Sequence, residues 1–306
     1  MEILLQQIIN GITIGAFYAL IALGYTMVYG VLKLINFAHG DLCMIGAYLG
    51  LTLVVSILVG GMIPNLFLAL LVIFLMVMGM VGVMGIIMER VAYRPLRRAG
   101  RLAPVVSALG MSIFLENAVM LIPAYGTSYH SYPKGLLPDL NWSFGGARMT
   151  LMQFVVLLIS FMLMAGLYFF VHYTRLGTAM RAVALDHNTA RLMGIDVNRI
   201  ISMVFFIGPA LGAAGGVMIG LYYGRIFFTM GWIYGLKAFI AAILGGIGNI
   251  PGAMVGGFLL GIIETLAAGF IPGGGAWKDA IAFVILILIL IFRPTGLLGE
   301  RVVERI

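Results

Sequence analysis

The chain has 306 residues, of which 62% are hydrophobic and 9% are charged. Soluble domains carry roughly 25% charged residues, so this composition excludes a soluble globular protein and indicates a chain that lies in a lipid bilayer. The net charge of +7 does not indicate nucleic-acid binding. Most basic residues fall in three short blocks, Arg90–Arg101, Arg175–Arg199 and Arg293–Arg305, and such blocks are typical of the cytoplasmic side of a membrane.

Apolar runs as long as a transmembrane helix recur along the whole chain. A helix needs about 20 apolar residues to cross a hydrocarbon core roughly 30 Å thick. Such runs lie near residues 3–30, 42–60, 65–88, 102–124, 151–172, 200–222, 236–270 and 279–293. With the basic blocks inside the cell, alternation places the N-terminus, the loop 125–150 and the connection 222–234 outside. The sequence therefore predicts an all-α polytopic membrane protein of about eight to ten helices, with one transmembrane domain over residues 1–306.

Two interruptions of these runs predict broken or re-entrant helices. Residues 236–270 are too many for one span, and the arm 236–249 would be only about 21 Å long as a helix. In the segment GGIGNIPG the glycines widen the range of backbone conformations and the proline removes a backbone N–H donor. The break is therefore expected there, at membrane depth. The second interruption is Val31–Asp41, where polar residues and glycines divide an apolar stretch. Irregular backbone survives in a bilayer only when it is buried in protein or lines a watery cavity.

The two interruptions predict inverted repeats with a translocation pathway between them, because a glycine-rich apolar helix follows each. The residues expected to line this pathway are Asn36, His39, Gly40, Gly245, Gly246, Gly248, Pro251 and Gly252. The alternative is that both interruptions are tight turns between helices. A separate stripe of glycines recurs every four residues and is interpreted as a surface for close packing of another helix. This stripe consists of Gly208, Gly212, Gly216 and Gly220.

The polar segment 173–199, between the fifth and sixth runs, predicts a cytoplasmic hairpin of two short helices. Asp186 and Asn188 are good N-cap residues, and Gly194 is a good helix stop. Asp196 can cap the next membrane helix. Apolar side chains among the arginines would suit a groove on another protein, which makes the hairpin a candidate coupling element. These side chains are Leu185, Leu192, Met193 and Ile195.

Ionisable residues give little support for chemistry within the chain. Glu116 and Glu264 lie inside apolar runs, where a charge costs several kcal/mol, and each is either part of a proton relay or, more simply, an interhelical hydrogen bond. No glycine precedes a lysine, so there is no GxxxxGK[ST] phosphate loop and another chain would have to bind ATP. The histidines and the single Cys43 show no metal-ligand spacing, and no nucleophile motif is present. The sequence predicts neither a metal site nor a catalytic site.

Several blocks carry a resemblance to a known family. Ala182, Asp186, Ala190 and Gly194 follow one another as in the cytoplasmic loop by which ABC importer permeases dock on their ATPase subunit, although the glutamate that opens that motif in many importers is missing. The other blocks are GYTMVYGVLKLINFAHGD at 24–41, ERVAYRPLR at 89–97, GMSIFLEN at 110–117 and FIAAILGGIGNIPGAMVGG at 239–257. With these blocks the chain resembles the branched-chain amino acid ABC transporter permeases nearly end to end.

The resemblance implies a multi-pass permease of the inner membrane that carries leucine, isoleucine, valine or a similar small amino acid. It implies a homologous second permease, two ATP-binding subunits that hold ATP and Mg, and a periplasmic or lipid-anchored amino-acid-binding protein outside, where loop 125–150 is one candidate surface. The chain itself would hold no cofactor and would not be an enzyme. The residues that would couple to the ATPase are Ala182, Leu185, Asp186, Ala190, Leu192, Met193, Gly194 and Ile195. The alternative is a proton- or sodium-coupled secondary transporter or channel that uses Glu116 or Glu264.

Overall fold

The computed structural model describes residues 2–299 apart from 98, 101 and 134. Its helices are α1 (Glu2–Leu32), α2 (His39–Leu53), α3 (Leu66–Met88), α4 (Leu102–Leu121), α5 (Leu151–Tyr173), α6 (Arg175–Leu185), α7 (His187–Leu192), α8 (Val197–Tyr223), α9 (Met230–Gly245), α10 (Ile250–Phe270) and α11 (Gly274–Phe292). The π-helical turns η1 (Val54–Val59) and η2 (Glu89–Tyr93) extend α2 and α3. In the described part, 8 helices are long and apolar enough to cross a membrane. The predicted all-α polytopic fold is confirmed.

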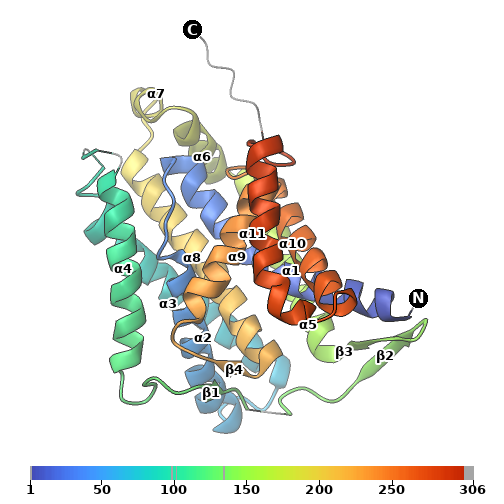
Figure 1. Ribbon diagram of the computed structural model, residues 1–306. Coiled ribbons are helices and arrows are strands. Elements are labelled where there is room, and N and C mark those ends of the chain that lie inside the picture. The colour runs from blue at the N-terminus through green and yellow to red at the C-terminus, as the bar shows by residue number, and fades with distance from the viewer. Residues whose placement is uncertain (1, 98, 101, 134, 300–306) are drawn as a thin grey trace.

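The bundle has two distinct ends (Figure 1). α6 and α7 lie at the upper end, with the start of α4 and the end of α11, so the arginine-rich segments share one face. This is the cytoplasmic face by the charge rule. At the opposite end lie the short strands β1 (His130–Ser131), β2 (Asn141–Phe144), β3 (Ala147–Thr150) and β4 (Arg225–Ile226).

The strands tie the external connections together. β1 pairs antiparallel with β4, which joins the loop 125–150 to the connection 222–234 on one face. β2 and β3 form a hairpin. The Gln6 side chain near the start of α1 donates a hydrogen bond to the Arg148 carbonyl of β3 (3.0 Å), so α1 begins at the external end.

The helices form two repeats that run in opposite directions. The first consists of α1, the non-helical segment 33–38, α2, α3 and α4, and the second of α8, the segment 224–229, α9, α10 and α11. α1 runs inward and α8 outward, and the contacts of α1 with α10 and α9 are matched by those of α8 with α3 and α2. The break at 33–38 therefore corresponds to 224–229. The glycine-rich turn at 245–252 corresponds to the turn 60–65 before α3, which differs from the pairing expected from the sequence.

α1 and α8 form the centre of the bundle, and the glycines of α8 face α1 and α2. A Cβ placed on Gly208 would stand 3.2 Å from the Gly24 carbonyl oxygen of α1, and one on Gly212 would stand 3.1 Å from the His39 ring. Gly216 lies against the Cys43 backbone of α2. Gly220, one turn further, lies against the ring of an external tyrosine. Small residues at such crossings let backbones approach closely, which adds van der Waals contact.

Candidate functional site

The polar segment after α5 folds as two short helices with capped ends. Thr174 caps α6 through an N–H of its first turn, and Asp186 caps α7 by accepting hydrogen bonds from the N–H groups of Asn188 and Thr189. The Thr189 hydroxyl and the Asn188 N–H hold the pKa of the Asp186 carboxyl below its ordinary value, so the cap is charged at neutral pH. Gly194, with φ of +81°, ends the second helix in a conformation that favours glycine.

This hairpin presents three large apolar side chains to solvent. Leu185, Leu192 and Met193 are 89%, 87% and 77% exposed. Ala190 is buried and Ile195 is half-buried, so these two pack the hairpin onto the rest of the chain. Burying a large apolar side chain is worth about 1.5–3 kcal/mol, so the exposed trio favours contact with a partner.

The hairpin and the base of α8 are tied to the ends of the membrane helices. The His187 ring contacts the Val31 carbonyl oxygen at the end of α1 (2.8 Å). Arg97 donates a hydrogen bond to the Asn198 side chain of α8 (2.8 Å) and forms an ion pair with the buried Glu89 of η2. The other Glu89 oxygen accepts from a serine hydroxyl of α8 (2.9 Å). A displacement of the hairpin would therefore reach α1, α3 and α8.

The segment 33–38 between α1 and α2 passes through the interior. Asn36 is buried, and its side-chain oxygen accepts a hydrogen bond from the Tyr93 hydroxyl (2.7 Å). His39, the first residue of α2, is fully buried, and its Nε2 contacts the Ile21 carbonyl oxygen (3.1 Å). Ile21 lies about 16 Å before the end of α1 at 1.5 Å per residue. α2 therefore begins at depth rather than at the cytoplasmic face.

Buried polar atoms without a hydrogen-bond partner gather on this part of the chain. Among the described residues they are Nδ2 of Asn36, Nδ1 of His39, Oδ1 of Asp41 and the hydroxyls of Thr26 and Tyr48, while the remaining one lies on Arg97. An orphaned polar atom costs about 1–3 kcal/mol in a dry interior. The second half of α1 and the start of α2 thus offer unused hydrogen-bonding groups to a polar species.

The start of α2 packs against the start of α9. Gly40 lies beside Gly231 and Gly235, and a Cβ on Gly235 would stand 2.9 Å from the Gly40 Cα. Neither helix has a side-chain cap at its first turn. The two breaks, 33–38 and 224–229, thus lead into helix starts that meet inside the bundle.

The turn between α9 and α10 lies elsewhere. Gly248 lies against Tyr29 and Gly30 at the end of α1, and the Asn249 side chain donates to the Leu298 carbonyl oxygen (2.9 Å). The break therefore lies at the cytoplasmic end. The prediction from the sequence, a break at membrane depth, is wrong. The reason is that α9 itself begins at depth and its 16 residues carry the chain to the face.

The residues expected to line one pathway consequently form two groups. Asn36, His39 and Gly40 lie inside the bundle where α2 and α9 begin. The second group lies in the α9–α10 turn and the first turn of α10, and consists of Gly245, Gly246, Gly248, Pro251 and Gly252. A cavity of about 580 Å³ joins this turn to the hairpin, with Gly30, Lys33, Ala182 and Leu185 among its walls.

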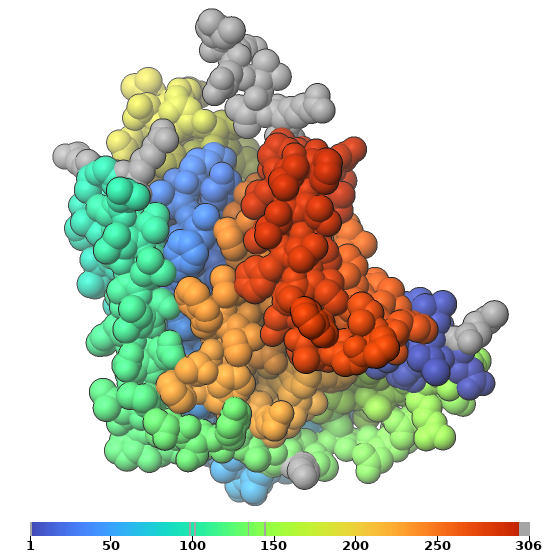
Figure 2. Space-filling model, in the orientation of Figure 1, coloured from blue at the N-terminus to red at the C-terminus, as the bar shows by residue number. Residues whose placement is uncertain are grey.

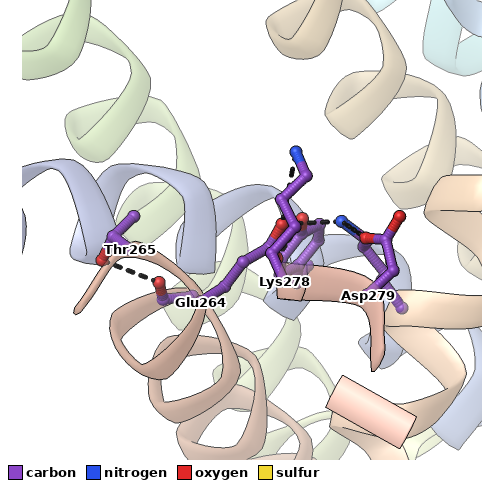
Figure 3. A network of polar contacts seen from close by, with 7 residues as sticks. Glu264, Thr265, Lys278 and Asp279 are labelled. Atoms are coloured by element: carbon purple, nitrogen blue, oxygen red, sulfur yellow. Dashed lines mark hydrogen bonds and ion pairs between the residues drawn. The ribbon is translucent and has the colours of Figure 1, made fainter. Parts of the chain in front are cut away.

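Glu264 forms a buried ion pair with Lys237, and two more exposed charges of α11, Lys278 and Asp279, extend it (Figure 3). One oxygen accepts from Lys237 of α9 (2.6 Å) and the other from the Tyr18 hydroxyl of α1 (2.7 Å). Lys237 also pairs with Asp279 of α11 (2.7 Å), and Lys278 stands 3.7 Å from Glu264. The group is therefore an interhelical tie, which agrees with the simpler of the two interpretations from the sequence.

Comparison with known proteins identifies the family. A family model described as the permease component of the branched-chain amino acid transport system matches residues 7–290, from α1 into α11. The chain belongs to this family. The high-affinity branched-chain amino acid transport system permease protein BraD of Pseudomonas aeruginosa is 46% identical over 99% of this chain and 98% of its own. The LivH permease protein of Escherichia coli K12, described in the same words, is 43% identical over 99% of this chain and 97% of its own.

A third relative has a different name. The probable branched-chain amino acid transport permease protein LivM of Methanocaldococcus jannaschii is 29% identical over 63% of this chain and 60% of its own. As a member of this permease family with its membrane-spanning helices, the chain is a multi-pass protein of the inner membrane. Its relatives are transport permeases and not enzymes.

Sequence reasoning places Lys237 and Asp41 among the ionisable residues near the edges of apolar runs but assigns neither residue a role. Lys237 lies within the run 236–270, and a lysine in such a run is a signal that a carboxylate such as Glu264 has a partner. Asp41 ends the interruption Val31–Asp41, and the structure leaves one of its buried oxygens without a hydrogen bond. The sequence does not show which elements surround either group.

Proposed function

We propose that this chain is the membrane-spanning permease subunit of an ATP-driven importer of branched-chain amino acids, coupled through residues 173–199 to a separate subunit that hydrolyses ATP. The observation that carries the coupling role is the exposed apolar surface of Leu185, Leu192 and Met193. A groove on a soluble subunit would bury these side chains, whereas a transporter driven by an ion gradient needs no such partner. The similarity to permeases of branched-chain amino acid transport systems supports the proposed cargo.

The proposed assembly contains a second, homologous permease, two ATP-binding subunits that hold ATP and Mg, and an amino-acid-binding protein that docks outside. Similarity to both LivH and LivM proteins supports a pair of related permeases. The external loop 125–150 is a proposed part of the docking surface, because its pairing with β4 connects it to the segment that leads into α9. A docked protein could thus shift the position of the start of α9.

The proposed path runs along the helix starts inside the bundle and leaves past the α9–α10 turn. Asn36, His39 and Gly40 lie on the inner part of the path, where unpartnered polar atoms can meet the charged ends of an amino acid. The glycine-rich turn at 245–252 lies on the cytoplasmic part of the path, beside the hairpin cavity. Because His187 joins the hairpin to the end of α1, motion of the ATP-binding subunits could open one part of the path while the other part closes.

The rival mechanism, coupling to a proton or sodium gradient, receives less support. Glu264 is held by Lys237 and Tyr18, so it is not a free proton acceptor. Glu116 is half-buried on α4 and close to Asp41. Coupling to a proton or sodium gradient also requires no exposed apolar hairpin.

The substitution Leu192→Asp tests the coupling role. It should abolish ATP-driven leucine uptake and reduce co-purification of the ATP-binding subunits at least tenfold. The reason is that a charge replaces the apolar Leu192 side chain, which is 87% exposed in the isolated chain and would be buried against the partner. Leu140→Asp makes the same change on the external face and should leave co-purification unchanged. Normal uptake by Leu192→Asp, or uptake driven by a proton gradient without ATP, would refute the proposal.

A further inference from the structure

Asp41 is a buried carboxyl group that has no ion-pair partner among the described residues. It is 2% exposed, and no lysine, arginine or histidine of the described residues forms an ion pair with it. Its Oδ1 has no hydrogen-bond partner and lies at Gly231 of α9, where a Cβ would stand 2.6 Å from it. Ser112 and Glu116 of α4 lie close to the same carboxylate. An isolated charge in such a place is unfavourable, so the site favours a positively charged ligand.

An apolar cavity begins one helical turn further along α2 than this carboxylate. It has a volume of about 800 Å³ and lies between α2, α3 and α4, lined among others by Ile45, Tyr48, Met80 and Leu115. Asp41 lies one turn before Ile45 on the same face of α2, because residues four apart in a helix are neighbours. An acidic group thus precedes an aliphatic space along α2.

We propose that Asp41 is the counter-ion for the ammonium group of the transported amino acid, whose aliphatic side chain enters the cavity between α2, α3 and α4. This inference rests on the proposed function and names the site where the chain holds its cargo. A branched-chain amino acid combines one ammonium group with an aliphatic body, and the site offers the complement of both. The Tyr48 hydroxyl, also without a partner, lies about 10 Å further along α2. One small amino acid cannot touch both groups at once, so they serve successive positions.

The start of α9 lies directly against this carboxylate. A Cβ on Gly231 would stand 2.6 Å from Asp41 Oδ1, and one on Gly235 would stand 2.9 Å from the Gly40 Cα, so access to Oδ1 requires the start of α9 to move away from α2. Figure 2 shows a furrow between α4 and the pair α9 and α11, with the blue atoms of the N-terminal helices at its base. This furrow lies between elements of the two repeats.

The test uses the complete assembly in proteoliposomes with its binding protein, and measures leucine uptake and ATP hydrolysis together. Asp41→Asn should lower uptake at least tenfold while ATP hydrolysis stimulated by the binding protein stays within twofold. Asp41→Glu, which keeps the charge, should retain at least a third of the uptake. Asp279→Asn removes an exposed carboxylate of the second repeat and should keep uptake within twofold. Uptake by Asp41→Asn within twofold of the unmodified assembly, or loss of both activities in Asp41→Asn and Asp41→Glu alike, would overturn the proposal.

A second variant tests the cavity without touching the buried carboxylate. Met80 is 47% exposed and lines the cavity, so Met80→Trp should narrow it and lower uptake at least fivefold with ATP hydrolysis retained. Leu71→Trp is the matched control, because Leu71 is 56% exposed on the same helix and outside the cavity lining. Equal uptake by the two variants would contradict the assignment. Absence of ATP-driven leucine uptake by the unmodified assembly would instead refute the proposed function.

Discussion

The buried ion pair between Lys237 and Glu264 allows a quantitative test of the bundle. Removing one partner of a buried pair costs about 3–5 kcal/mol, because the other charge is left without compensation. For Lys237→Met we expect about 3 kcal/mol, the lower end, since Lys278 stands 3.7 Å from Glu264 and keeps part of the attraction. Glu264→Gln should cost less, about 2 kcal/mol, because Lys237 retains Asp279 at 2.7 Å.

The double variant carries the decisive information. In Lys237→Met with Glu264→Gln no buried charge remains in the pair, and the amide oxygen can still accept from Tyr18, so the cost should fall to about 2 kcal/mol. The two single costs sum to about 5 kcal/mol, which leaves a coupling energy of about 3 kcal/mol. The assay is reversible unfolding of the purified protein in mixed micelles with increasing SDS, followed by circular dichroism. Lys278→Met, at an exposed position, is the control and should cost less than about 1 kcal/mol.

Additive costs would refute this reasoning. If the double variant loses the sum of the single losses within about 0.5 kcal/mol, the two groups do not interact. A loss below about 1 kcal/mol for Lys237→Met would show that the site is hydrated rather than dry. Either result would also remove the argument that Glu264 is unavailable as a proton acceptor.

Two further predictions concern packing and the hairpin. Gly46→Ala should destabilise the protein by about 1–3 kcal/mol, because the added Cβ would stand 2.5 Å from the Ala213 Cα, whereas Gly110→Ala, with no atom within 4 Å, should cost nothing in the same unfolding assay. The depressed pKa of Asp186 makes its cap contribute fully above the unfolded value of 3.8 and lose this contribution as pH falls through the lower folded value. Hydrogen exchange in α7, corrected for intrinsic rates, should thus be equally slow at pH 7 and pH 5 and faster near pH 2, and Asp186→Asn should abolish this change.

Much of the fold follows from local sequence signals. The apolar runs predict the membrane helices because each must supply its own backbone hydrogen bonds in lipid. The two short helices after α5 also follow from local chemistry, since Asp186 caps α7 through its own neighbours and Gly194 ends it. These interactions lie within a few residues of one another, so the sequence contains all the partners.

The parts that sequence reasoning missed depend on contacts far apart in the chain. The connection 222–234 is predicted from the sequence, and Gly224 ends α8, but the sequence does not show that β4 pairs with β1, some ninety-five residues earlier, or that the next helix begins inside the bundle. Once α9 begins after the segment 224–229, its length carries the turn at 245–252 to the cytoplasmic face. Lys237 and Glu264 are likewise 27 residues apart and meet only through the packing of α9 and α10.

The two repeats use charge in opposite ways, and this asymmetry indicates where a ligand acts. Between α9 and α11 the charges are matched, because Lys237 stands between Glu264 and Asp279. Between α2 and α4 the corresponding space holds Asp41 and Glu116 and receives no basic partner from the described residues. In the second repeat, the charges between α9 and α11 therefore neutralise one another. In the first repeat, the acidic groups between α2 and α4 favour a cation from outside the chain. The ammonium group of a zwitterionic amino acid supplies this cation. When the amino acid leaves, no added charge remains at Asp41, so the site returns to its original state.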